Sequence, residues 1–395
     1  MKIDTLRVED ICDFVGGSQP AKSEFINEPK TGYVRLIQTR DYKTDSYPTY
    51  IPENSTRKFC DEDDIMIGRY GPPVFQICSG LKGAYNVALL KAKPKAGVDR
   101  EFLYYFLKQK SVFQYVDKLS ARTGGQTGVD LVSLNKYPVR IPNDITDQRT
   151  LVNSLVAIDK KIELNNRINA ELEAMTKTLY DYWFVQFDFP DANGKPYKTS
   201  GGKLKYSELL KQYIPEHWNE CQLRDLVLFE YGKPLKASIR SGSGYPVFGS
   251  SGVIGFHDSF LVKGPGIVVG RKGTVGKVNY VFDDFFPIDT TYYAKANKDY
   301  SLIYINYLLC SLGLETMNSD SAVPGLNRES ALRLQTVQPP SILVEKYHNL
   351  VSVWFNKKKQ ILQESDELVS LRDWLLPMLM NGQVTVKPST EPKNV

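Results

Sequence analysis

The sequence predicts two tandem α/β (α+β) domains, each followed by a long helix, with the two helices paired as an antiparallel coiled coil about a pseudo-two-fold axis. Three observations support this prediction. The chain has 395 residues, enough for two or three domains of about 100–200 residues each. A Gly-Arg-x-Gly motif occurs twice after similar apolar runs. Two long segments carry apolar residues about every 3.5 positions.

The composition is that of a globular protein of the cytoplasm. Hydrophobic residues make up 42% of the chain and charged residues 24%, and 50 basic against 45 acidic residues give a formal net charge of +5. This charge is compatible with a nucleic-acid partner but does not by itself indicate one. We expect no signal peptide or membrane span. The five cysteines and three histidines lack metal-ligand spacing, which predicts reduced thiols and no metal site.

The repeated motif belongs to a longer internal duplication. "IMIGRYG" (65–71) matches "IVVGRKG" (267–273), and "LRVEDICDFVGG" (6–17) matches "CQLRDLVLFEYG" (221–232) in the same order. The separation between equivalent residues falls in steps from 215 to 197 along the chain, as loop insertions in the first copy would produce. Ordered matches of this kind predict that one structural unit is present twice.

Each copy has the same predicted layout of strands, a short helix, a Gly-containing loop and a final strand. Runs of β-branched and aromatic residues bounded by Gly or Pro predict the strands. The elements named by this pattern are strands at 33–38, 64–67, 266–269 and 275–281, helices near 100–108 and 302–310, and Gly-containing loops at 120–130 and 318–329.

The segments 147–186 and 344–380 are predicted to be long helices. Their apolar stripes are Leu151, Leu155, Ile158, Ile162, Ile168, Leu172, Met175 and Leu179 in the first, and Tyr347, Val351, Trp354, Ile361, Leu368, Leu371 and Leu375 in the second. Asn165 and Asn169 interrupt the first stripe, and Lys358 and Ser365 the second. About 40 helical residues extend roughly 60 Å, more than a small domain spans. We therefore expect the two helices to pack against each other.

These patterns divide the chain into six segments. They are a first domain at 1–145, a first helix at 146–188, a solvated linker rich in Gly, Pro, Lys and Ser at 189–216, a second domain at 217–341, a second helix at 342–383 and a polar tail at 384–395.

The sequence contains no recognisable catalytic motif. There is no P-loop, because "VVGRKGTVGK" (268–277) lacks the spacing and is followed by β-branched residues rather than a helix. Methyltransferase motifs and a Ser-His-Asp arrangement are also missing. "DEDD" (61–64) could hold Mg²⁺, but the equivalent "VKGPG" of the second copy has no acids. A solvated turn is the favoured interpretation.

Basic, amide and hydroxyl residues gather on equivalent loops of the two copies. Arg can bond guanine O6 and N7 or clamp a phosphate, Asn and Gln read base edges, and Ser and Thr hold phosphates. The alternative is a set of tight turns whose surface side chains bind nothing. The candidate DNA-binding residues are Gln38, Thr39, Arg40, Arg69, Tyr70, Arg122, Thr123, Gln126, Thr127, Ser250, Ser251, Arg271, Lys272, Thr274, Lys277, Asn318, Ser319, Asn327 and Arg328.

The stretch "LVNSLVAIDKKIELNNRINAELEAMTKTLYDYWFVQFDFP" (151–190) carries an Ile-Asp-Lys-Lys-Ile turn, an Asn-Asn pair and a closing Leu-Tyr-x-x-Trp-Phe. It resembles the central conserved helix of specificity subunits from type I restriction-modification systems. "LRDWLLPMLMNGQV" (371–384) is similar to the same family, whereas "FNKKKQILQESDEL" (355–368) matches it less literally. The resemblance covers essentially the whole chain, including the duplication.

The resemblance implies that each domain is a target recognition domain reading one half of a bipartite, asymmetric site in double-stranded DNA. The coiled coil would set the gap between half-sites and dock two methyltransferase subunits, and restriction (motor) subunits would join for cleavage. Candidate partner-binding residues, taken to face away from the helix seam, are Asn165, Asn166, Tyr182, Trp183, Trp374 and Met378. For the aromatic residues, packing in the local core is the alternative.

The same resemblance implies that the chain is a non-catalytic DNA-binding subunit of the prokaryotic cytoplasm. S-adenosylmethionine, ATP and Mg²⁺ would belong to the partner subunits, and this chain would hold no cofactor. A duplicated coiled-coil scaffold for protein interactions, without DNA readout, is the alternative function. The repeat and the coiled coil fit both functions, while the basic and amide residues on equivalent loops favour DNA readout.

Overall fold

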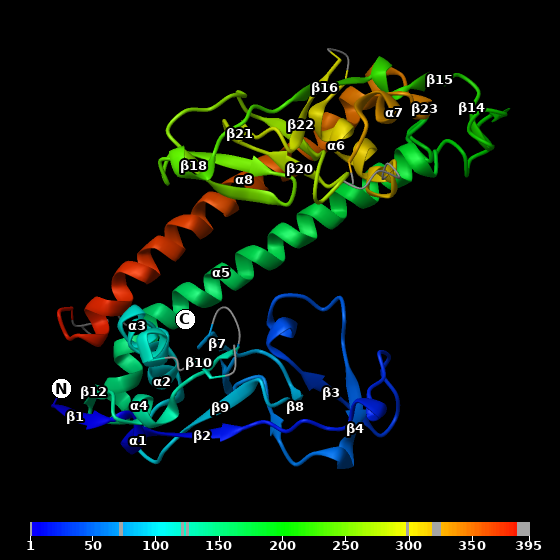
Figure 1. Ribbon diagram of the computed structural model, residues 1–395. Coiled ribbons are helices and arrows are strands. Elements are labelled where there is room, and N and C mark those ends of the chain that lie inside the picture. The colour runs from blue at the N-terminus through cyan, green and yellow to red at the C-terminus, as the bar shows by residue number, and fades with distance from the viewer. Residues whose placement is uncertain are drawn as a thin grey trace, which may run out of the picture. The chain divides into compact units, whose positions relative to one another are not determined.

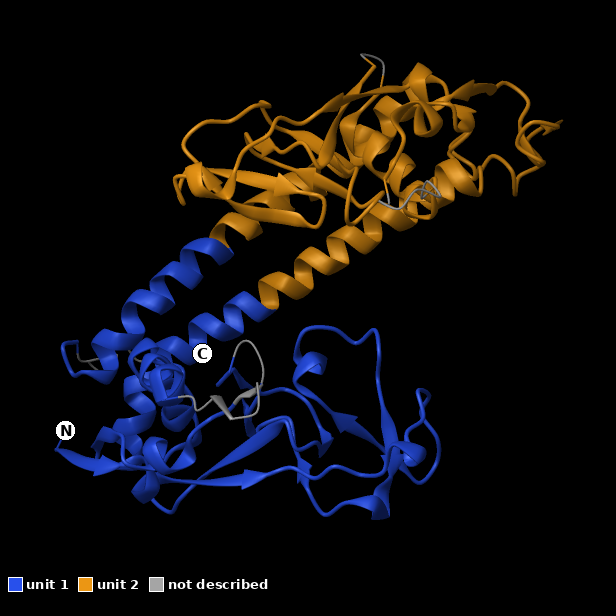
Figure 2. Ribbon diagram, viewed as in Figure 1, with its two compact units in different colours: residues 1–163, 365–395 blue, residues 164–364 orange. Residues whose placement is uncertain are grey.

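The computed structural model describes residues 2–70, 74–119, 122–123, 126–297, 300–317 and 325–384; for 122–123 and 126–127 only the backbone is described. The chain forms two compact units, which Figure 2 colours separately. Unit 1 comprises residues 1–163 and 365–395, and unit 2 comprises residues 164–364. The division falls within both long helices, α5 (Ile145–Tyr180) and α8 (Ser341–Met380), so each unit holds one part of each helix.

Unit 1 contains two four-stranded sheets, a terminal strand pair and a short hairpin (Figure 1). One sheet has the antiparallel order β2-β9-β6-β7, and the other has the order β4-β3-β8-β5 with β3 and β8 parallel. The strands are β1 (Ile3–Arg7), β2 (Cys12–Gly16), β3 (Tyr33–Ile37), β4 (Tyr50–Pro52), β5 (Phe59–Cys60), β6 (Ile65–Gly68), β7 (Ile77–Cys78), β8 (Gly83–Tyr85), β9 (Leu89–Pro94), β10 (Arg122–Thr123), β11 (Gln126–Thr127) and β12 (Pro138–Pro142), with β1 paired to β12.

Unit 2 repeats this topology. Its main sheet has the antiparallel order β16-β22-β19-β20, its second sheet has the order β18-β17-β21 with β17 and β21 parallel, and β15 pairs with β23. The strands are β13 (Leu204–Ser207), β14 (Gln212–Pro215), β15 (Asn219–Gln222), β16 (Val227–Tyr231), β17 (Tyr245–Gly249), β18 (Gly252–His257), β19 (Gly266–Gly270), β20 (Val278–Val281), β21 (Phe286–Pro287), β22 (Thr291–Ala296) and β23 (Gln335–Gln338).

Helices cover the sheets at matching places in the chain order. They are α1 (Val8–Ile11), α2 (Arg100–Leu107), α3 (Lys110–Leu119) and α4 (Leu131–Asn135) in unit 1, and α6 (Leu302–Ser311) and α7 (Arg328–Leu332) in unit 2. Short 3₁₀ turns are η1 (Lys22–Glu24), η2 (Thr39–Tyr42), η3 (Glu53–Ser55), η5 (Leu223–Asp225), η6 (Ala237–Ile239) and η7 (Leu314–Thr316), and a π-helical turn, η4 (Asp181–Val185), extends α5. No helix in the described ranges combines the length and apolarity of a membrane span.

The predicted duplication is confirmed by equivalent close approaches as well as by strand order. A Cβ on Gly17 would lie 2.0 Å from the Asn86 carbonyl oxygen, and one on Gly232 would lie 2.1 Å from the Ile288 carbonyl oxygen. Only glycine fits where two backbones come this close. The same glycine therefore closes the same strand in both copies. One predicted strand is shorter than expected, because Gly276 has a φ of 73° and β20 starts only at Val278.

The two long helices pair in opposite directions within each unit. In unit 1, Arg372 of α8 donates to Asp159 of α5 at 2.9 Å. In unit 2, the partners on α8 descend as those on α5 rise: Asn165 bonds to Glu364, Glu173 to Lys358, and Tyr347 to the Thr176 carbonyl oxygen. The predicted antiparallel coiled coil is thus confirmed.

Some predicted seam positions are wrong. Met175 and Leu371 are exposed, whereas Thr176, which was not among the predicted positions, is buried. The polar positions predicted to interrupt the first stripe, Asn165 and Asn169, are both buried. The alternating spacing of four and three residues that starts at Leu151 continues unbroken through these polar positions. Met175 and Leu371 each lie one residue before a seam position, at Thr176 and Arg372, and therefore point away from the seam. At these sites the position in the heptad, and not the hydrophobicity of the side chain, decides which residue is buried.

The segment at 189–216, predicted to be a solvated linker, is ordered and folds onto unit 2. Phe189 stacks on Tyr197 with ring centroids 4.7 Å apart and on Trp218 at 5.2 Å. The hairpin β13–β14 follows, and Ile214 at its end is fully buried. The few aromatic and apolar residues of this segment bury enough surface to order it despite its Gly, Pro and Lys content.

Candidate nucleic-acid interface

In unit 1, the Gly-Arg turn after β6 lies against the loop before α4. Tyr70 forms an isolated antiparallel bridge with Gly128, and the Val129 amide donates to the Arg69 carbonyl oxygen at 3.1 Å. The Arg69 amide itself donates to the Ala88 carbonyl oxygen at 2.8 Å. Two motifs that are about 60 residues apart in the chain are therefore joined by backbone hydrogen bonds.

In unit 2, the equivalent residues make the same contacts. Lys272 forms an isolated bridge with Gly325, and the Leu326 amide donates to the Arg271 carbonyl oxygen at 2.9 Å. The Arg271 amide donates to the Thr290 carbonyl oxygen at 2.9 Å. Both copies thus use one backbone scheme to hold an Arg-containing turn beside the start of a short helix.

The residues that follow β3 in unit 1 and β17 in unit 2 form a third predicted segment. In each unit this segment lies next to the Gly-Arg turn. A Cβ on Gly68 would lie 3.4 Å from Thr39 Cγ2, and one on Gly273 would lie 3.2 Å from Ser250 Oγ. Lys277 Nζ donates to the Ser251 carbonyl oxygen at 2.7 Å. Strand-end and turn residues therefore lie together in each unit, beside the ends of the Gly-containing loops at 128–129 and 325–326.

The two turn arginines lie on aromatic rings, but on different ones. The guanidinium of Arg69 lies 5.0 Å from the ring centroid of Tyr70, its neighbour in the chain. That of Arg271 lies 4.9 Å from the ring of Tyr231 and 5.8 Å from that of Tyr292. Contacts of this kind attract the cation to the ring and fix the plane of the guanidinium.

In unit 2, Arg271 lines a small polar pocket. This pocket, of about 300 Å³, is lined by Tyr231, Arg271, Lys272, Tyr292 and residues 325–329. The Tyr292 hydroxyl donates to the Leu326 carbonyl oxygen at 2.9 Å, and burial raises the pKa of that hydroxyl, so it stays a neutral donor. The hydrogen bond ties the loop to the sheet beneath it. Basic side chains on such a concave surface suit an anionic or base-edge ligand.

Comparison with known proteins identifies the family of the chain. The family model for type I restriction modification DNA specificity domains matches residues 2–174 and 215–337. The chain belongs to this family. The two matched segments correspond to the two copies found in the sequence, so the chain carries two specificity domains, and the family is that of the DNA specificity component of type I restriction-modification systems.

Relatives with similar lengths and folds are known. The type I restriction enzyme MjaIX specificity subunit of Methanocaldococcus jannaschii is 24% identical, with 97% of this chain and 94% of that protein covered. The HindI specificity subunit of Haemophilus influenzae is 31% identical over 28% of this chain and 24% of its own length. The crystal structure of a type I S subunit from M. genitalium has a similar fold, with a TM-score of 0.58, 18% identity and 96% of each chain covered.

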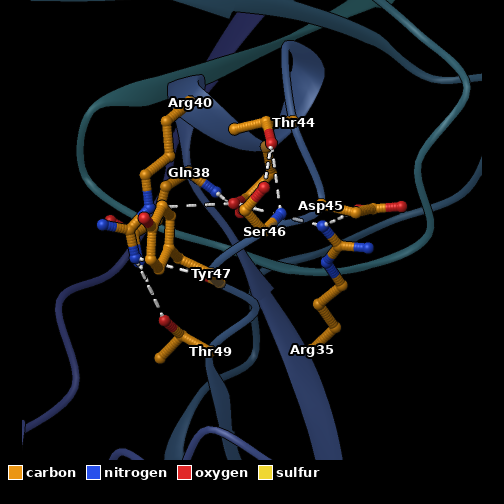
Figure 3. Close-up of polar contacts among 9 residues, drawn as sticks. Arg35, Gln38, Arg40, Thr44, Asp45, Ser46, Tyr47 and Thr49 are labelled. Carbon is orange, nitrogen blue, oxygen red and sulfur yellow. Dashed lines mark hydrogen bonds and ion pairs between the residues drawn. The ribbon is translucent and has the colours of Figure 1, made fainter. Parts of the chain in front are cut away.

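The first specificity domain has an additional loop beside its candidate residues. Arg40 donates to the Tyr47 carbonyl oxygen at 3.4 Å and to Thr49 Oγ1 at 3.3 Å, and Gln38 also donates to Thr49 Oγ1 at 3.3 Å. Figure 3 shows Arg40 directed toward Thr49, while Arg35 bonds Asp45 on the other side of the loop. Gln38 and Arg40 are therefore held by the loop, and an alternative partner must compete with these bonds.

Three aromatic residues at these surfaces were not predicted from the sequence. Tyr47 is 70% exposed at the tip of the additional loop in the first domain, and Tyr231 and Tyr292 support Arg271 in the second. Tyr231 directly precedes Gly232 of the repeated motif, which is the one sequence signal that could have drawn attention to it. Aromatic residues with one exposed face are common where bases or sugars bind.

The remaining candidate residues have varied placements. Thr274 is exposed, and Arg328 lies near Tyr231 at 5.3 Å. Asn327 is the N-cap of α7, and its Oδ1 accepts from the Ser330 amide at 3.0 Å, so it has a structural role of its own. The side chains of Arg122, Thr123, Gln126 and Thr127 lie outside the described part of the structure, although their backbones form the hairpin β10–β11, and Asn318 and Ser319 also lie outside it.

Two of the six candidate partner contacts do not face outward, which corrects their predicted position. Asn165 is 1% exposed and donates to Glu364 inside the helix seam, and Trp183 is 5% exposed in the core of unit 2. The seam and the aromatic core bury these side chains because both lie on the inner face of α5 and its π-helical end. Asn166 is exposed, Trp374 is 55% exposed, and Tyr182 and Met378 are half-buried.

The acidic run at 61–64 forms a turn, as favoured from the sequence. Asp61 pairs with Lys82 at 2.9 Å, and Asp64 accepts from the Asp61 amide at 2.8 Å and pairs with Lys91. The hydrogen bond from Lys82 lowers the pKa of Asp61. Among the described residues, no group of three or more His, Cys, Asp or Glu side chains could hold a metal ion.

Proposed function

We propose that the chain is the DNA-sequence specificity subunit of a type I restriction-modification complex, and that each domain reads one half of a bipartite, asymmetric site in double-stranded DNA. One observation carries this proposal. Both domains repeat the same backbone scheme of strand end, Gly-Arg turn and Gly-containing loop, yet present different side chains from it. One backbone arrangement that presents different side chains in each domain suits the recognition of two half-sites with different sequences.

The candidate residues of these surfaces fall into two groups, those suited to phosphate contacts and those suited to contacts with base edges. Lys272, Thr274 and Lys277 are exposed on the turn of the second domain and suit phosphate contacts, which fix the register of the protein on the duplex. The guanidinium groups of Arg69 and Arg271 lie on aromatic rings, which preorganises them for bidentate hydrogen bonds to a base edge. Phosphate contacts supply salt-dependent affinity, and the base contacts supply specificity.

The chain itself performs no chemistry in this proposal. Two methyltransferase subunits, which use S-adenosylmethionine, would dock on the long helices, and restriction (motor) subunits would supply the ATP- and Mg²⁺-dependent steps. The exposed side chains of Asn166 and Trp374 are the partner contacts that remain best placed on the helix surfaces. A reader of cellular and incoming DNA works in the prokaryotic cytoplasm.

The helices have a second proposed role as a spacer. α5 has 36 residues and α8 has 40, and they pair in opposite directions. A helical spacer of fixed length would set the number of unread base pairs between the half-sites. The scaffold alternative explains the helices but gives no reason for two equivalent Arg-containing surfaces.

Methylome sequencing tests this function directly. Cells lacking endogenous type I systems would express the chain with the methyltransferase subunit encoded beside it, and matched cells would express the methyltransferase alone. We expect a bipartite motif containing methylated adenine only when this chain is present. A complex that assembles without producing any motif would contradict DNA readout and favour the scaffold function.

A further inference from the structure

The second specificity domain supports its turn arginine in a way that the first does not. In the paired strands β16 and β22, Tyr231 lies opposite Tyr292. In the equivalent strands β2 and β9, Gly16 lies opposite Leu90. A Cβ on Gly16 would lie 4.0 Å from both Arg69 Nη1 and Leu90 Cδ2. The arginine of the first domain therefore contacts one ring, that of Tyr70, with Leu90 in place of Tyr292, whereas that of the second contacts the two facing strand rings.

Two guanidinium groups share the ring of Tyr231. Those of Arg271 and Arg328 lie 4.9 and 5.3 Å from its centroid. The ring in turn packs edge-on against Tyr292 with centroids 5.1 Å apart. The positions in the first domain that match Tyr231 and Arg328 are Gly16 and Leu131, so neither the ring nor the second guanidinium has an equivalent at those two positions.

The charges around Arg271 leave it available for a ligand. Its Nη1 donates to the Asp289 carbonyl oxygen at 3.1 Å, and no carboxylate among the described residues is within ion-pair distance of it. The acid of the pocket, Glu329, is paired instead with Arg328 at 3.2 Å and with Arg224 at 3.4 Å. Arg271 is therefore held by a backbone carbonyl and lies beside the Tyr292 hydroxyl, while no described carboxylate neutralises its charge.

We propose that Arg271 reads a guanine in the half-site of the second domain. This inference rests on the proposed function. The Tyr231 ring and the Asp289 carbonyl hold the guanidinium in one orientation, and the N–H groups that do not face Asp289 or Tyr292 then offer a preorganised pair of donors. Such a pair matches O6 and N7 of guanine in the major groove. A phosphate needs no such rigidity and is served by the exposed Lys272 beside it.

Two kinds of change test this assignment. The first is methylome sequencing with Arg271→Lys and Arg271→Ala, with Arg333→Ala as a matched control, because Arg333 is exposed in the same domain away from the pocket. The second is competition binding by the assembled complex with duplexes in which each guanine of the wild-type motif is replaced in turn by 7-deazaguanine, which lacks the N7 acceptor. The second test needs no variant to fold.

We expect one guanine of one half-site to lose its preference in both Arg271 variants, with discrimination falling about 5- to 150-fold, the range for one bidentate pair. At that guanine, 7-deazaguanine should weaken binding by the wild type but not by Arg271→Ala. The other half-site and the control variant should stay unchanged. Arg69→Ala should alter only the other half-site, if it has any effect on the motif.

Two results would overturn the assignment. Unchanged base preferences together with indifference to 7-deazaguanine would remove Arg271 from base readout. A uniform loss of affinity, with the salt dependence of binding reduced by about one phosphate contact, would make Arg271 a phosphate clamp instead. A wild-type complex that produces no bipartite motif at all would contradict the proposed function itself, which is a separate failure.

Discussion

Arg372 on α8 donates a hydrogen bond of 2.9 Å to the carboxylate of Asp159 on α5. The second oxygen of the same carboxylate accepts from the Tyr105 hydroxyl of α2 at 2.7 Å. One carboxylate thus joins both long helices to the helix that covers the main sheet of unit 1. Asp159 and Arg372 are both less than a third exposed, so solvent screens this contact only in part.

Replacing Asp159 by Ala should lower the free energy of unfolding by about 2 kcal/mol, because a half-buried hydroxyl and a guanidinium both lose a charged acceptor. Urea unfolding followed by circular dichroism measures the change. Glu171→Ala is the matched control, since Glu171 is exposed on the same helix. Equal stability of the two variants would show that the junction contributes nothing.

The polar seam of unit 2 gives a prediction of opposite sign. Asn169 is 7% exposed, and neither polar atom of its side chain has a hydrogen-bond partner within the described residues. Asn169→Leu should therefore raise the free energy of unfolding by about 1 kcal/mol. Asn166→Leu, three positions earlier on the exposed face of the same helix, should change it by less than about 0.5 kcal/mol. A loss of stability in Asn169→Leu would mean that the amide has a stabilising role.

Alkaline pH should destabilise unit 2 through Tyr280. Burial raises the pKa of this hydroxyl to about 12, and its ring packs on Phe355 at 4.9 Å. A raised folded-state pKa contributes stability that is complete below the ordinary value of about 10 and is lost as the pH rises toward 12. Unfolding free energies at pH 8, 10 and 11 should fall less steeply for Tyr280→Phe than for the wild type. Parallel slopes would contradict this.

The spacer role predicts the effect of removing one heptad. Deleting seven residues within 158–172 of α5, with a matching seven within 358–365 of α8, keeps the heptad register and shortens the pair by roughly 10 Å. At about 3.4 Å per base pair, the gap in the methylated motif should shrink by about three positions while both half-sites persist. Methylome sequencing that returns the wild-type gap from an assembled complex would refute the spacer.

The sequence predicted the elements of the fold well where patterns were local. The duplication followed from ordered matches around the Gly-Arg turns, and both long helices followed from their apolar spacing. The seam was misassigned at Met175 and Leu371, and Thr176 was missed, because a pattern of apolar residues cannot show a heptad position that is polar. The ordering of 189–216 depends on Phe189 meeting Trp218, a contact that composition does not reveal.

The candidate site was predictable only in part. Equivalent turns and loops were found because they repeat, and the structure brings them together. The environment of Arg271 was not predictable, because Tyr231 lies 40 residues before it and becomes its neighbour only through the strand order β16-β22-β19. Such contacts are set by sheet topology, which a single sequence constrains weakly.

The most direct measurement of the central claim, that each domain reads its own half-site, is the methylome of a chimaera. Residues 217–341 would be replaced by the equivalent domain of another type I specificity protein whose site is known, with both long helices kept. We expect a motif in which one half changes to that of the donor, while the other half and the gap stay as in the wild type. A motif that changes in both halves, or in neither, would contradict it.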